Sequence, residues 1–360
     1  MSVDEGRATA PDAVAITVLG PVPVAELGVT LPHEHIFIDG SVWFYHDSDP
    51  RRAAVADVPV AMEYLGLLHR NPMLCRDNMR LDNLDLAVRE VSEFRSAGGR
   101  TIVDLTPNGS QPQPERLREV ARRTGVHIVA GCGYYVDAAH PPDMAQRSID
   151  VLTAELITAV QQGINGTDVR AGIIGEIGTS VQITPNEEKV LRAGARAHLH
   201  TGAAVNVHLE VGGQEGHKVL DILAGEGVAL DRVVLSHLDQ TLSDPSYHRS
   251  LMDRGAYIEF DTFGSEFYYD QWATQERRDT ERVAAVAALV AAGYTERLLL
   301  SHDIWLKMLL KRYGGLGYDH LLVNVVPMLN RAGVTEAHLH TMMIENPARV
   351  LAISAPLHAA

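Results

Sequence analysis

Short apolar runs rich in β-branched residues recur along the chain at fairly regular intervals. Runs of this kind are typical of buried β-strands. Between most neighbouring runs lies a longer segment whose apolar residues recur with helical spacing. The predicted strands cover residues 29–38, 101–106, 126–131, 172–177, 204–209, 232–237, 256–261 and 297–303. The predicted helices cover residues 82–97, 115–124, 148–163, 186–201, 216–226 and 280–293.

This alternation of strand and helix predicts a parallel sheet. Eight units in about 270 residues favour a (β/α)₈ TIM barrel over an open doubly wound sheet. The glycine fingerprint of dinucleotide-binding folds is also missing after the first run. Residues 15–27 predict a short N-terminal β-hairpin that covers the bottom of the barrel. No linker is apparent, so we expect a single domain over residues 1–360, with residues 1–13 flexible.

Charge and cysteine content narrow the possible partners. Lysine and arginine number 31 against 46 acidic residues, a formal net charge of −15. So acidic a chain is not expected to bind nucleic acid, because it offers little counterion release. The longest small-apolar run, 283–292, is too short for a membrane span. The start of the chain lacks the basic and apolar regions of a secretion signal, and two cysteines build no disulfide framework. We therefore expect a cytoplasmic protein without a membrane partner.

Metal-capable side chains stand at the ends of several predicted strands. His33 and His35 end the first strand, and alternation places them on one face, with Glu34 on the other. A lone His-x-His pair is a weak signal. However, the carboxyl ends of all strands of a TIM barrel meet at one mouth. Four further groups stand at such ends: Glu176, His208, His237 and Asp303.

Four imidazoles and two carboxylates without thiolates suit zinc, manganese, cobalt or nickel, and the ligand types do not choose among these metals. Six ligands exceed the three that one catalytic zinc normally uses. Two metal ions bridged by one carboxylate would use all six. Such a pair can hold a hydroxide and polarise a substrate oxygen. Asp303 could both bind a metal and accept the proton of that hydroxide.

Several segments together resemble one known family. They are Thr30 to His35, Gly172 to Gly178, Val234 to Asp239, Ser301 to Asp303 and Ile344 to Pro347, with support from Gly133 to Asp137, Glu259 to Glu266 and Lys311 to Pro327. From about Val14 to Leu351 the chain resembles the phosphotriesterase family of the amidohydrolase superfamily, and most closely its phosphotriesterase-related branch.

The resemblance implies a barrel hydrolase with two metal ions. His33, His35 and Asp303 would hold the more buried ion, and His208 and His237 the more exposed one. Glu176 would bridge the two ions.

The chain departs from phosphotriesterases proper at two positions. Those enzymes bridge their metals with a carboxylated lysine where this chain has Glu176. Their strand-7 histidine, thought to relay a proton from the catalytic aspartate, aligns with Thr262. Both differences argue against phosphotriester hydrolysis. They also leave the proton route from Asp303 open, with His302 or Asp239 as alternatives.

The expected reaction is attack of a metal-bridged hydroxide on a carbonyl centre. The resemblance favours amide cleavage of a small N-acyl compound, followed by lactone or carboxylic ester cleavage, and phosphotriesters last. An alternative from a different class is a barrel that binds metal or a small molecule without turnover.

Aromatic residues gather in segments predicted to surround the mouth. Three follow the first strand and five follow the seventh: Trp43, Phe44, Tyr45, Phe263, Phe267, Tyr268, Tyr269 and Trp272. Exposed aromatic clusters usually mark a contact surface. They predict either a wall or lid for a small-molecule substrate or a homodimer contact. As substrate-binding candidates we take Trp43, Phe263, Tyr268 and Trp272, together with Tyr134 and Tyr135 after the third strand.

Overall fold

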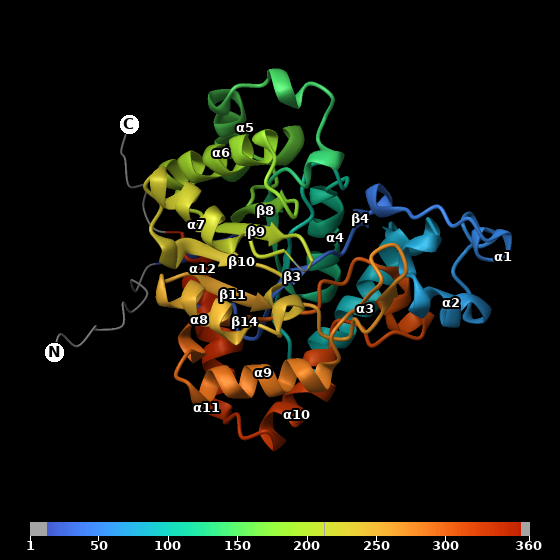
Figure 1. Ribbon diagram of the computed structural model, residues 1–360. Helices are drawn as coiled ribbons and strands as arrows, with labels where there is room; N and C mark the ends of the chain where they lie inside the picture. Colours follow the sequence, from blue (N-terminus) through green and yellow to red (C-terminus); the bar gives the residue numbers. More distant parts are fainter. Residues whose placement is uncertain (1–12, 212, 354–360) are drawn as a thin grey trace.

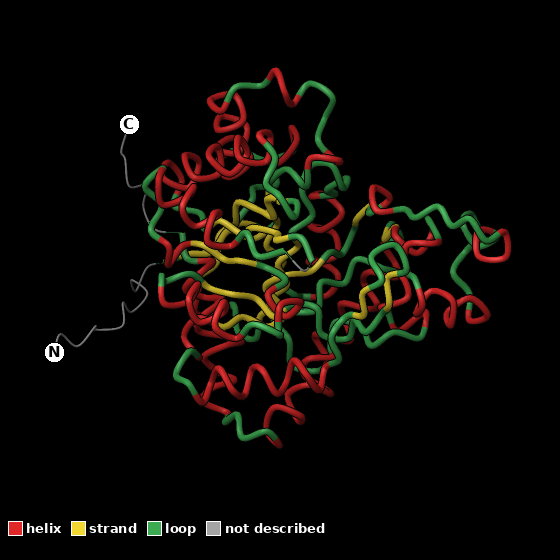
Figure 2. Tube along the Cα trace, viewed as in Figure 1, coloured by secondary structure: helices red, strands yellow, loops and turns green. Residues whose placement is uncertain are grey.

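The computed structural model describes residues 13–211 and 213–353. At its centre lies a sheet of eight parallel strands in the order β14-β11-β10-β9-β8-β7-β6-β3, ringed by helices (Figures 1 and 2). The strands are β3 (Thr30–Glu34), β6 (Thr101–Asp104), β7 (His127–Cys132), β8 (Ile173–Thr179), β9 (Val205–Leu209), β10 (Val233–Leu235), β11 (Tyr257–Phe260) and β14 (Leu298–Leu300). All eight lie within or overlap the predicted strands.

The first and last strands meet, which nearly closes the sheet into a barrel. The Asp303 amide donates to the His33 carbonyl oxygen at 3.2 Å, and the Ser301 hydroxyl donates to the same oxygen at 2.7 Å. The His33 amide in turn donates to Ser301 Oγ at 3.1 Å. These bonds confirm the predicted TIM barrel, and they also bring the carboxyl end of β14 against that of β3.

The helical ring follows the sequence pattern closely. The six predicted helices are confirmed as α3 (Leu84–Ser96), α4 (Pro114–Thr124), α5 (Ile149–Gln161), α6 (Pro185–Thr201), α7 (Gly216–Gly225) and α9 (Asp279–Ala291). Helix α8 (Pro245–Asp253), between β10 and β11, was not predicted. Its start nevertheless carries a sequence signal, because the Asp244 side chain caps the Tyr247 amide and Pro245 takes the first helical position. Short helices α10 (Val326–Arg331), α11 (Glu336–His340) and α12 (Asn346–Leu351) end the described chain.

The predicted N-terminal hairpin is confirmed as β1 (Val14–Thr17) paired with β2 (Gly20–Pro23). Gly20 has φ +115°, which a residue with a side chain rarely adopts. Residues of this hairpin region and of α12 pack on the apolar side chains inside the barrel, which seals its amino-terminal end. This cluster includes Ala15, Leu27, Val103, Val129, Ile173, Val234, Leu299 and Leu351. The expected flexibility of residues 1–13 falls, apart from residue 13, outside the described residues.

Two segments at the opposite end of the barrel lie against each other. One holds the short elements between β4 (Ile38–Asp39) and β5 (Arg80–Leu81), including α1 (Pro50–Ala53) and α2 (Leu65–Arg70), and projects from the barrel (Figure 1). The other is the hairpin of β12 (Tyr268–Tyr269) and β13 (Thr274–Gln275). Asp270 of the hairpin pairs with Arg52 and, at 3.4 Å, with Arg70. The two aromatic-rich segments singled out in the sequence therefore form one structure beside the mouth.

No helix in the described part of the chain is long and apolar enough to cross a membrane. Cys75 and Cys132 are both buried and free.

Candidate active site

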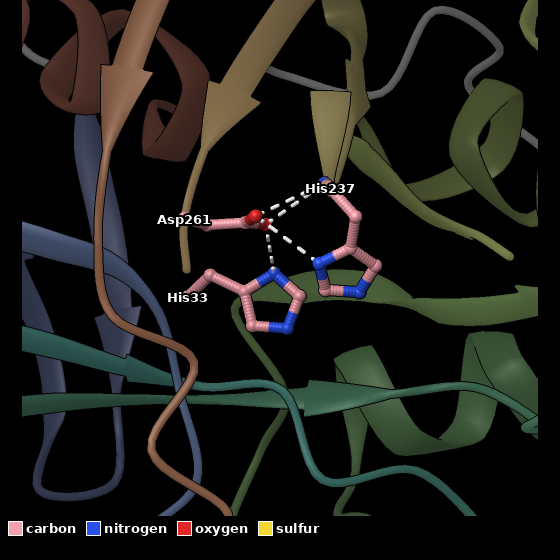
Figure 3. A group of neighbouring side chains, drawn as sticks. All are labelled: His33, His237 and Asp261. Carbon is pink, nitrogen blue, oxygen red and sulfur yellow. Dashed lines mark hydrogen bonds and ion pairs between the residues drawn. The ribbon is translucent and has the colours of Figure 1, made fainter. Parts of the chain in front are cut away.

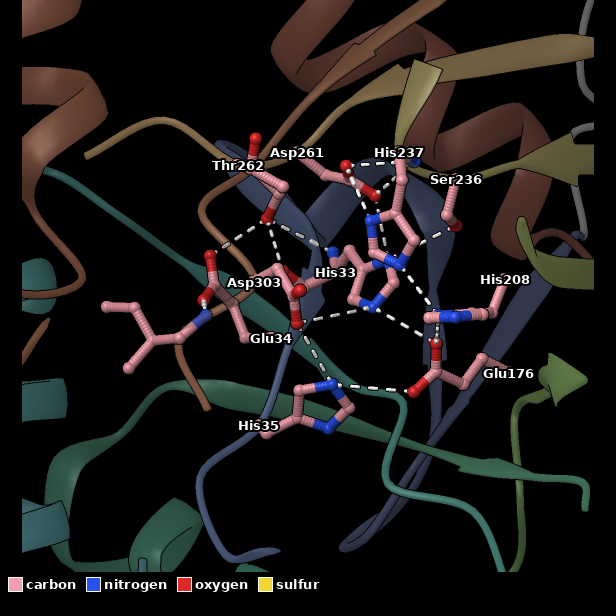
Figure 4. A network of polar contacts seen from close by, with 12 residues as sticks. His33, Glu34, His35, Glu176, His208, Ser236, His237, Asp261, Thr262 and Asp303 are labelled. Carbon is pink, nitrogen blue, oxygen red and sulfur yellow. Dashed lines mark hydrogen bonds and ion pairs between the residues drawn. The ribbon is translucent and has the colours of Figure 1, made fainter. Parts of the chain in front are cut away.

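The six predicted ligands converge at the mouth of the barrel because they lie in or just beyond five parallel strands, in the half of the barrel where the carboxyl ends of those strands meet. His33 ends β3 with His35 following, Glu176 lies in β8 and His208 in β9, while the last two follow β10 and β14 (Figure 4). All are buried except Asp303, whose side chain is 13% exposed.

Three of these side chains form one group. Asp303 Oδ1 lies 3.1 Å from His35 Nε2 and 3.7 Å from His33 Nε2. One ligand atom from each of the three lies within 4.8 Å of the other two. This is the trio that the resemblance assigns to the more buried metal ion.

Glu176, His208 and His237 form a second group of the same compactness. His208 Nδ1 lies 3.2 Å from Glu176 Oε2 and 2.8 Å from His237 Nε2. Glu176 also reaches the first group, with Oε1 at 3.5 Å from His35 Nε2 and Oε2 at 3.7 Å from His33 Nε2. Its carboxylate therefore stands between the two groups, as a bridging ligand must.

The donor atoms fit divalent metal ions. Zinc ligands lie about 2.0–2.2 Å from the ion, so tetrahedral partners are about 3.3–3.6 Å apart. The separations of 2.8–3.7 Å within the two groups lie on both sides of this range. His33 Nε2 and His208 Nε2 are buried and have no hydrogen-bond partner among the described residues. Such orphaned polar atoms are costly unless something binds them. A metal ion in each group would satisfy them.

Asp261, directly after β11 (Tyr257–Phe260), is a further part of this cluster that the sequence analysis missed. Its Oδ2 lies 3.0 Å from His33 Nδ1, and its Oδ1 lies 3.1 Å from His237 Nδ1 and accepts the His237 amide at 3.0 Å (Figure 3). One carboxylate thus binds one ring from each group at Nδ1 and leaves both Nε2 atoms facing the cluster. The sequence does offer one signal for Asp261, because this residue ends the predicted strand over residues 256–261.

We expect the Asp261→Asn protein to bind metal about 10–100-fold more weakly, because an asparagine cannot accept from both imidazoles. Competition with a chelator of known affinity measures this change. The Asp253→Asn protein, altered at an exposed carboxylate on α8, is the control. Equal metal affinity in the two variants would show that Asp261 does not orient the ligands.

The charges within the cluster stabilise one another. Burial alone would raise the pKa of Glu176, but the neighbouring histidines, chiefly His208, hold it below its usual value. The pKa of Asp303 is likewise lowered by His35 and His33 against the effect of burial. Burial would lower the pKa of His237, yet Asp261 raises it to about 9. The carboxylates of this site therefore favour bound cations.

The two alternatives considered for proton relay make other contacts, although Asp239 Oδ1 has no hydrogen-bond partner among the described residues. Asp239 Oδ2 accepts from Thr262 Oγ1 at 2.6 Å and from Arg282 Nε at 2.7 Å. His302 Nδ1 lies 2.7 Å from Glu34 Oε1, and its Nε2 accepts the Leu321 amide at 2.9 Å. Where phosphotriesterases proper carry a histidine, this chain has Thr262, which is held in a buried network around Arg282.

Replacing Arg282 by leucine is expected to lower the free energy of unfolding by about 3–5 kcal/mol, because Asp239 would remain buried without its cation. Arg282 is fully buried and also contacts Asp279 at 3.2 Å. Urea unfolding measures the change. Arg123, in an exposed pair with Asp85, supplies the matched Arg123→Leu control with an expected cost of about 0–1 kcal/mol. Similar losses in both variants would contradict this account.

A cavity of about 20 Å³ adjoins four of the six ligands. Its lining comprises His35, Ile38, Gly40, Trp43, Ser110, Tyr135, Glu176, His208, Asp303 and Trp305. Trp43 Nε1 donates to Tyr135 Oη at 3.2 Å, and the Tyr135 ring lies 5.0 Å from the ring of His208. Trp272 packs 6.0 Å from Trp43, centroid to centroid. Two of the predicted substrate residues, Trp43 and Tyr135, thus line the cavity, and Trp272 packs against one of them without lining it. Ser110 and Trp305 also line the cavity and were not predicted.

The other three predicted substrate residues lie elsewhere. The Tyr134 hydroxyl contacts Glu155 of α5 and lies 3.0 Å from Arg147 Nη1, so this ring faces the helical layer. Phe263 is buried in the apolar core, and the Tyr268 ring is covered by the guanidinium of Arg70 at 3.8 Å. None of them lines the cavity.

A (β/α)₈ barrel whose mouth gathers these imidazoles and carboxylates has the features of a metal-dependent barrel enzyme. Residues 14–351 match the model of the Phosphotriesterase family. The chain belongs to this family, as the sequence motifs predicted, and it is a hydrolase of the phosphotriesterase-like type.

Similar proteins and structures cover nearly the whole chain. An N-acetyltaurine hydrolase of Tetraodon nigroviridis is 38% identical over 334 residues, which are 92% of this chain and 95% of that protein. The Bos taurus N-acetyltaurine hydrolase is 35% identical with the same coverage. A resiniferatoxin-binding protein from Rhodobacter sphaeroides has a TM-score of 0.93 at 41% identity, covering 94% of this chain and 95% of that one. The phosphotriesterase homology protein from Escherichia coli has a TM-score of 0.75 at 33% identity, covering 91% and 99%.

Proposed function

We propose that this protein hydrolyses the amide bond of a small N-acyl compound at a centre of two divalent metal ions. The observation that carries the proposal is the pair of ligand groups sharing Glu176 at the barrel mouth. The relatives named N-acetyltaurine hydrolase act, by their name, on an amide of this kind.

Zinc is the metal we propose, held by His33, His35 and Asp303 on one side and by His208 and His237 on the other, with Glu176 between them. Manganese, cobalt and nickel suit the same ligand types. When bound, such ions lower the pKa of water and polarise a carbonyl oxygen.

Side chains of the protein would carry out proton transfer and substrate binding. Asp303 has the most exposed carboxylate of the six ligands and stays ionised, so it can accept the proton of the attacking water and pass it to the leaving amine. Tyr135 Oη accepts from Trp43, which leaves its own proton for a substrate oxygen. Burial and the negative charges of Glu176 and Asp303 raise the pKa of this phenol, so it stays protonated.

Two other reactions use the same geometry. Lactones and carboxylic esters present a comparable carbonyl, and a lactonase from Listeria monocytogenes is 26% identical with a TM-score of 0.76. Phosphotriesters come last, because Glu176 and Thr262 replace the residues of phosphotriesterases proper.

A second candidate function, from a different class, is a barrel that binds a small molecule without turnover. The likeness to the resiniferatoxin-binding protein favours this candidate.

We also propose that the protein is cytoplasmic and forms a homodimer, and that it has no nucleic-acid or membrane partners. The free cysteines are consistent with a reducing compartment, and the net charge of −15 disfavours phosphate backbones. Sedimentation velocity tests the dimer.

The decisive experiment pairs metal analysis with a substrate panel. Purified protein should contain close to two metal ions per chain, and it should hydrolyse N-acyl amides faster than lactones, esters or phosphotriesters. A fully metallated protein that binds these compounds but cleaves none would support the binding barrel instead.

A further inference from the structure

A second cavity, of about 290 Å³, lies at the amino-terminal end of the barrel. Its lining comprises Ile16, Thr17, Val18, Leu19, Gly20, Arg118, Arg122, Asp168 and Arg170. The first five belong to the β1–β2 hairpin, the next two lie on α4, and the last two precede β8. Helix α4 ends just before β7 begins, so these segments meet where the strands start. The cavity is therefore at the opposite end of the barrel from the candidate active site, and none of the six predicted ligands lines it.

The charged side chains of this cavity are three cations and one anion. Arg118, Arg122 and Arg170 stand against a single carboxylate, that of Asp168. The local formal charge is therefore 3 − 1 = +2, although the whole chain carries −15. Guanidinium groups bind the oxygens of phosphates and carboxylates through paired N–H donors. The cavity is therefore suited to an oxyanion.

Hydrogen bonds hold two of the arginines in place. Arg118 Nε donates to the Val18 carbonyl oxygen at 3.3 Å, its Nη2 donates to Asp168 Oδ1 at 2.6 Å, and its side chain is only 20% exposed. Arg170 Nε donates to the Val160 carbonyl oxygen at 2.9 Å. Each guanidinium keeps further N–H donors that bond to no other described residue. Donors that are already oriented lose less conformational entropy when a ligand binds.

Arg122 adds positive charge that the cavity does not neutralise. It lies in the last turn of α4, and no hydrogen bond or ion pair joins it to another described residue. Its charge still acts on Asp168, because the pKa of this carboxyl is lowered chiefly by the hydrogen bond from Arg118 and further by the charge of Arg122. One carboxylate, with a side chain that is 81% exposed, cannot balance both cations. Positive charge therefore remains for a ligand.

We propose that this cavity is a binding site for a small phosphorylated molecule, with the phosphate group between the three arginines. This site is independent of the proposed amide hydrolysis. A phosphate monoester has a second pKa of about 6 and carries close to two negative charges near pH 7, which matches the local charge of +2 better than a single carboxylate does. The volume of about 290 Å³ is near the lower limit of small-molecule sites and leaves room for an organic group beside the phosphate. Leu19, 53% exposed at the hairpin turn, offers that group an apolar contact.

Isothermal titration of the metal-loaded protein with glycerol 3-phosphate, inorganic phosphate and acetate, at matched ionic strength, tests the site. Glycerol 3-phosphate should bind about tenfold or more tightly than acetate, because it offers more charged oxygens to the guanidinium groups. It should also bind more tightly than inorganic phosphate. Inorganic phosphate bound as tightly as the ester would assign the site to the free ion instead. Saturable binding of neither phosphate compound would overturn the proposal.

Variants locate the binding signal, since phosphate oxygens also bind divalent metal ions. Arg122→Gln should weaken the binding of glycerol 3-phosphate about tenfold, and Asp168→Asn should strengthen it by removing a competing negative charge. Both positions are exposed and lie outside the candidate metal centre, so phosphate bound there would not respond.

Arg123→Gln is the matched control. Arg123 lies in the same last turn of α4, pairs with Asp85 and does not line the cavity, so its replacement removes an equal charge and should leave the affinity unchanged. Equal losses of affinity in Arg122→Gln and Arg123→Gln protein would show a general effect of charge and refute the site. Unchanged affinity in both Arg122→Gln and Asp168→Asn protein would place the bound phosphate elsewhere.

Discussion

Asp303→Asn protein is expected to keep most of its metal while its turnover falls by about 10²–10⁴. Asparagine has the size of aspartate and keeps one oxygen for the ion near His33 and His35, but it accepts no proton. The loss should appear in kcat as well as in kcat/KM, because the missing interaction is made in the transition state.

The comparison requires matched metal occupancy, since metal loss would produce the same fall. Metal content by mass spectrometry should therefore accompany each rate. Normal turnover in fully metallated Asp303→Asn protein would rule out this residue as the base. The engagement of His302 by Glu34 and of Asp239 by Arg282 makes both poor replacements.

Glu176→Ala is expected to lose at least one of the two metal ions and nearly all activity. Glu176 reaches His35 with one carboxylate oxygen and His33 and His208 with the other, and alanine leaves two cations facing each other without a shared anion. Metal analysis and kcat on the best amide substrate measure the two effects. Glu63→Ala, at an exposed position, is the control.

Two metal ions and full activity in Glu176→Ala protein would refute the bridging assignment. Glu176→Lys adds a sharper comparison with phosphotriesterases proper, which use a carboxylated lysine at this place. Activity that returns on addition of bicarbonate would show that this pocket supports lysine carboxylation.

Much of the fold was readable from local patterns. The eight apolar runs and six amphipathic segments became strands and helices because their periodicity matches the structure they form. Helix α8 was not predicted because nine residues are too few to show a clear helical periodicity, although Asp244 and Pro245 mark its start. The topology rule that parallel strand ends meet at one mouth then predicted which side chains gather there.

The substrate side was harder to predict. Tyr134 and Tyr135 are neighbours in the sequence, yet one hydroxyl turns to Glu155 and the other to Trp43. The conformation of the segment after β7 decides between these directions, and no sequence period describes it. Trp305 was overlooked although it stands only two residues after Asp303.

The sequence by itself determined the barrel, its bottom hairpin and the convergence of His33, His35, Glu176, His208, His237 and Asp303, because strand periodicity and barrel topology are enough to place them. Only the tertiary structure decided the roles of Asp261 and Arg282 and the pairing of the mouth segments through Asp270. Those contacts join residues far apart in the chain, such as His33 and Asp261, and they depend on side-chain directions that are set only when the strands and loops pack together.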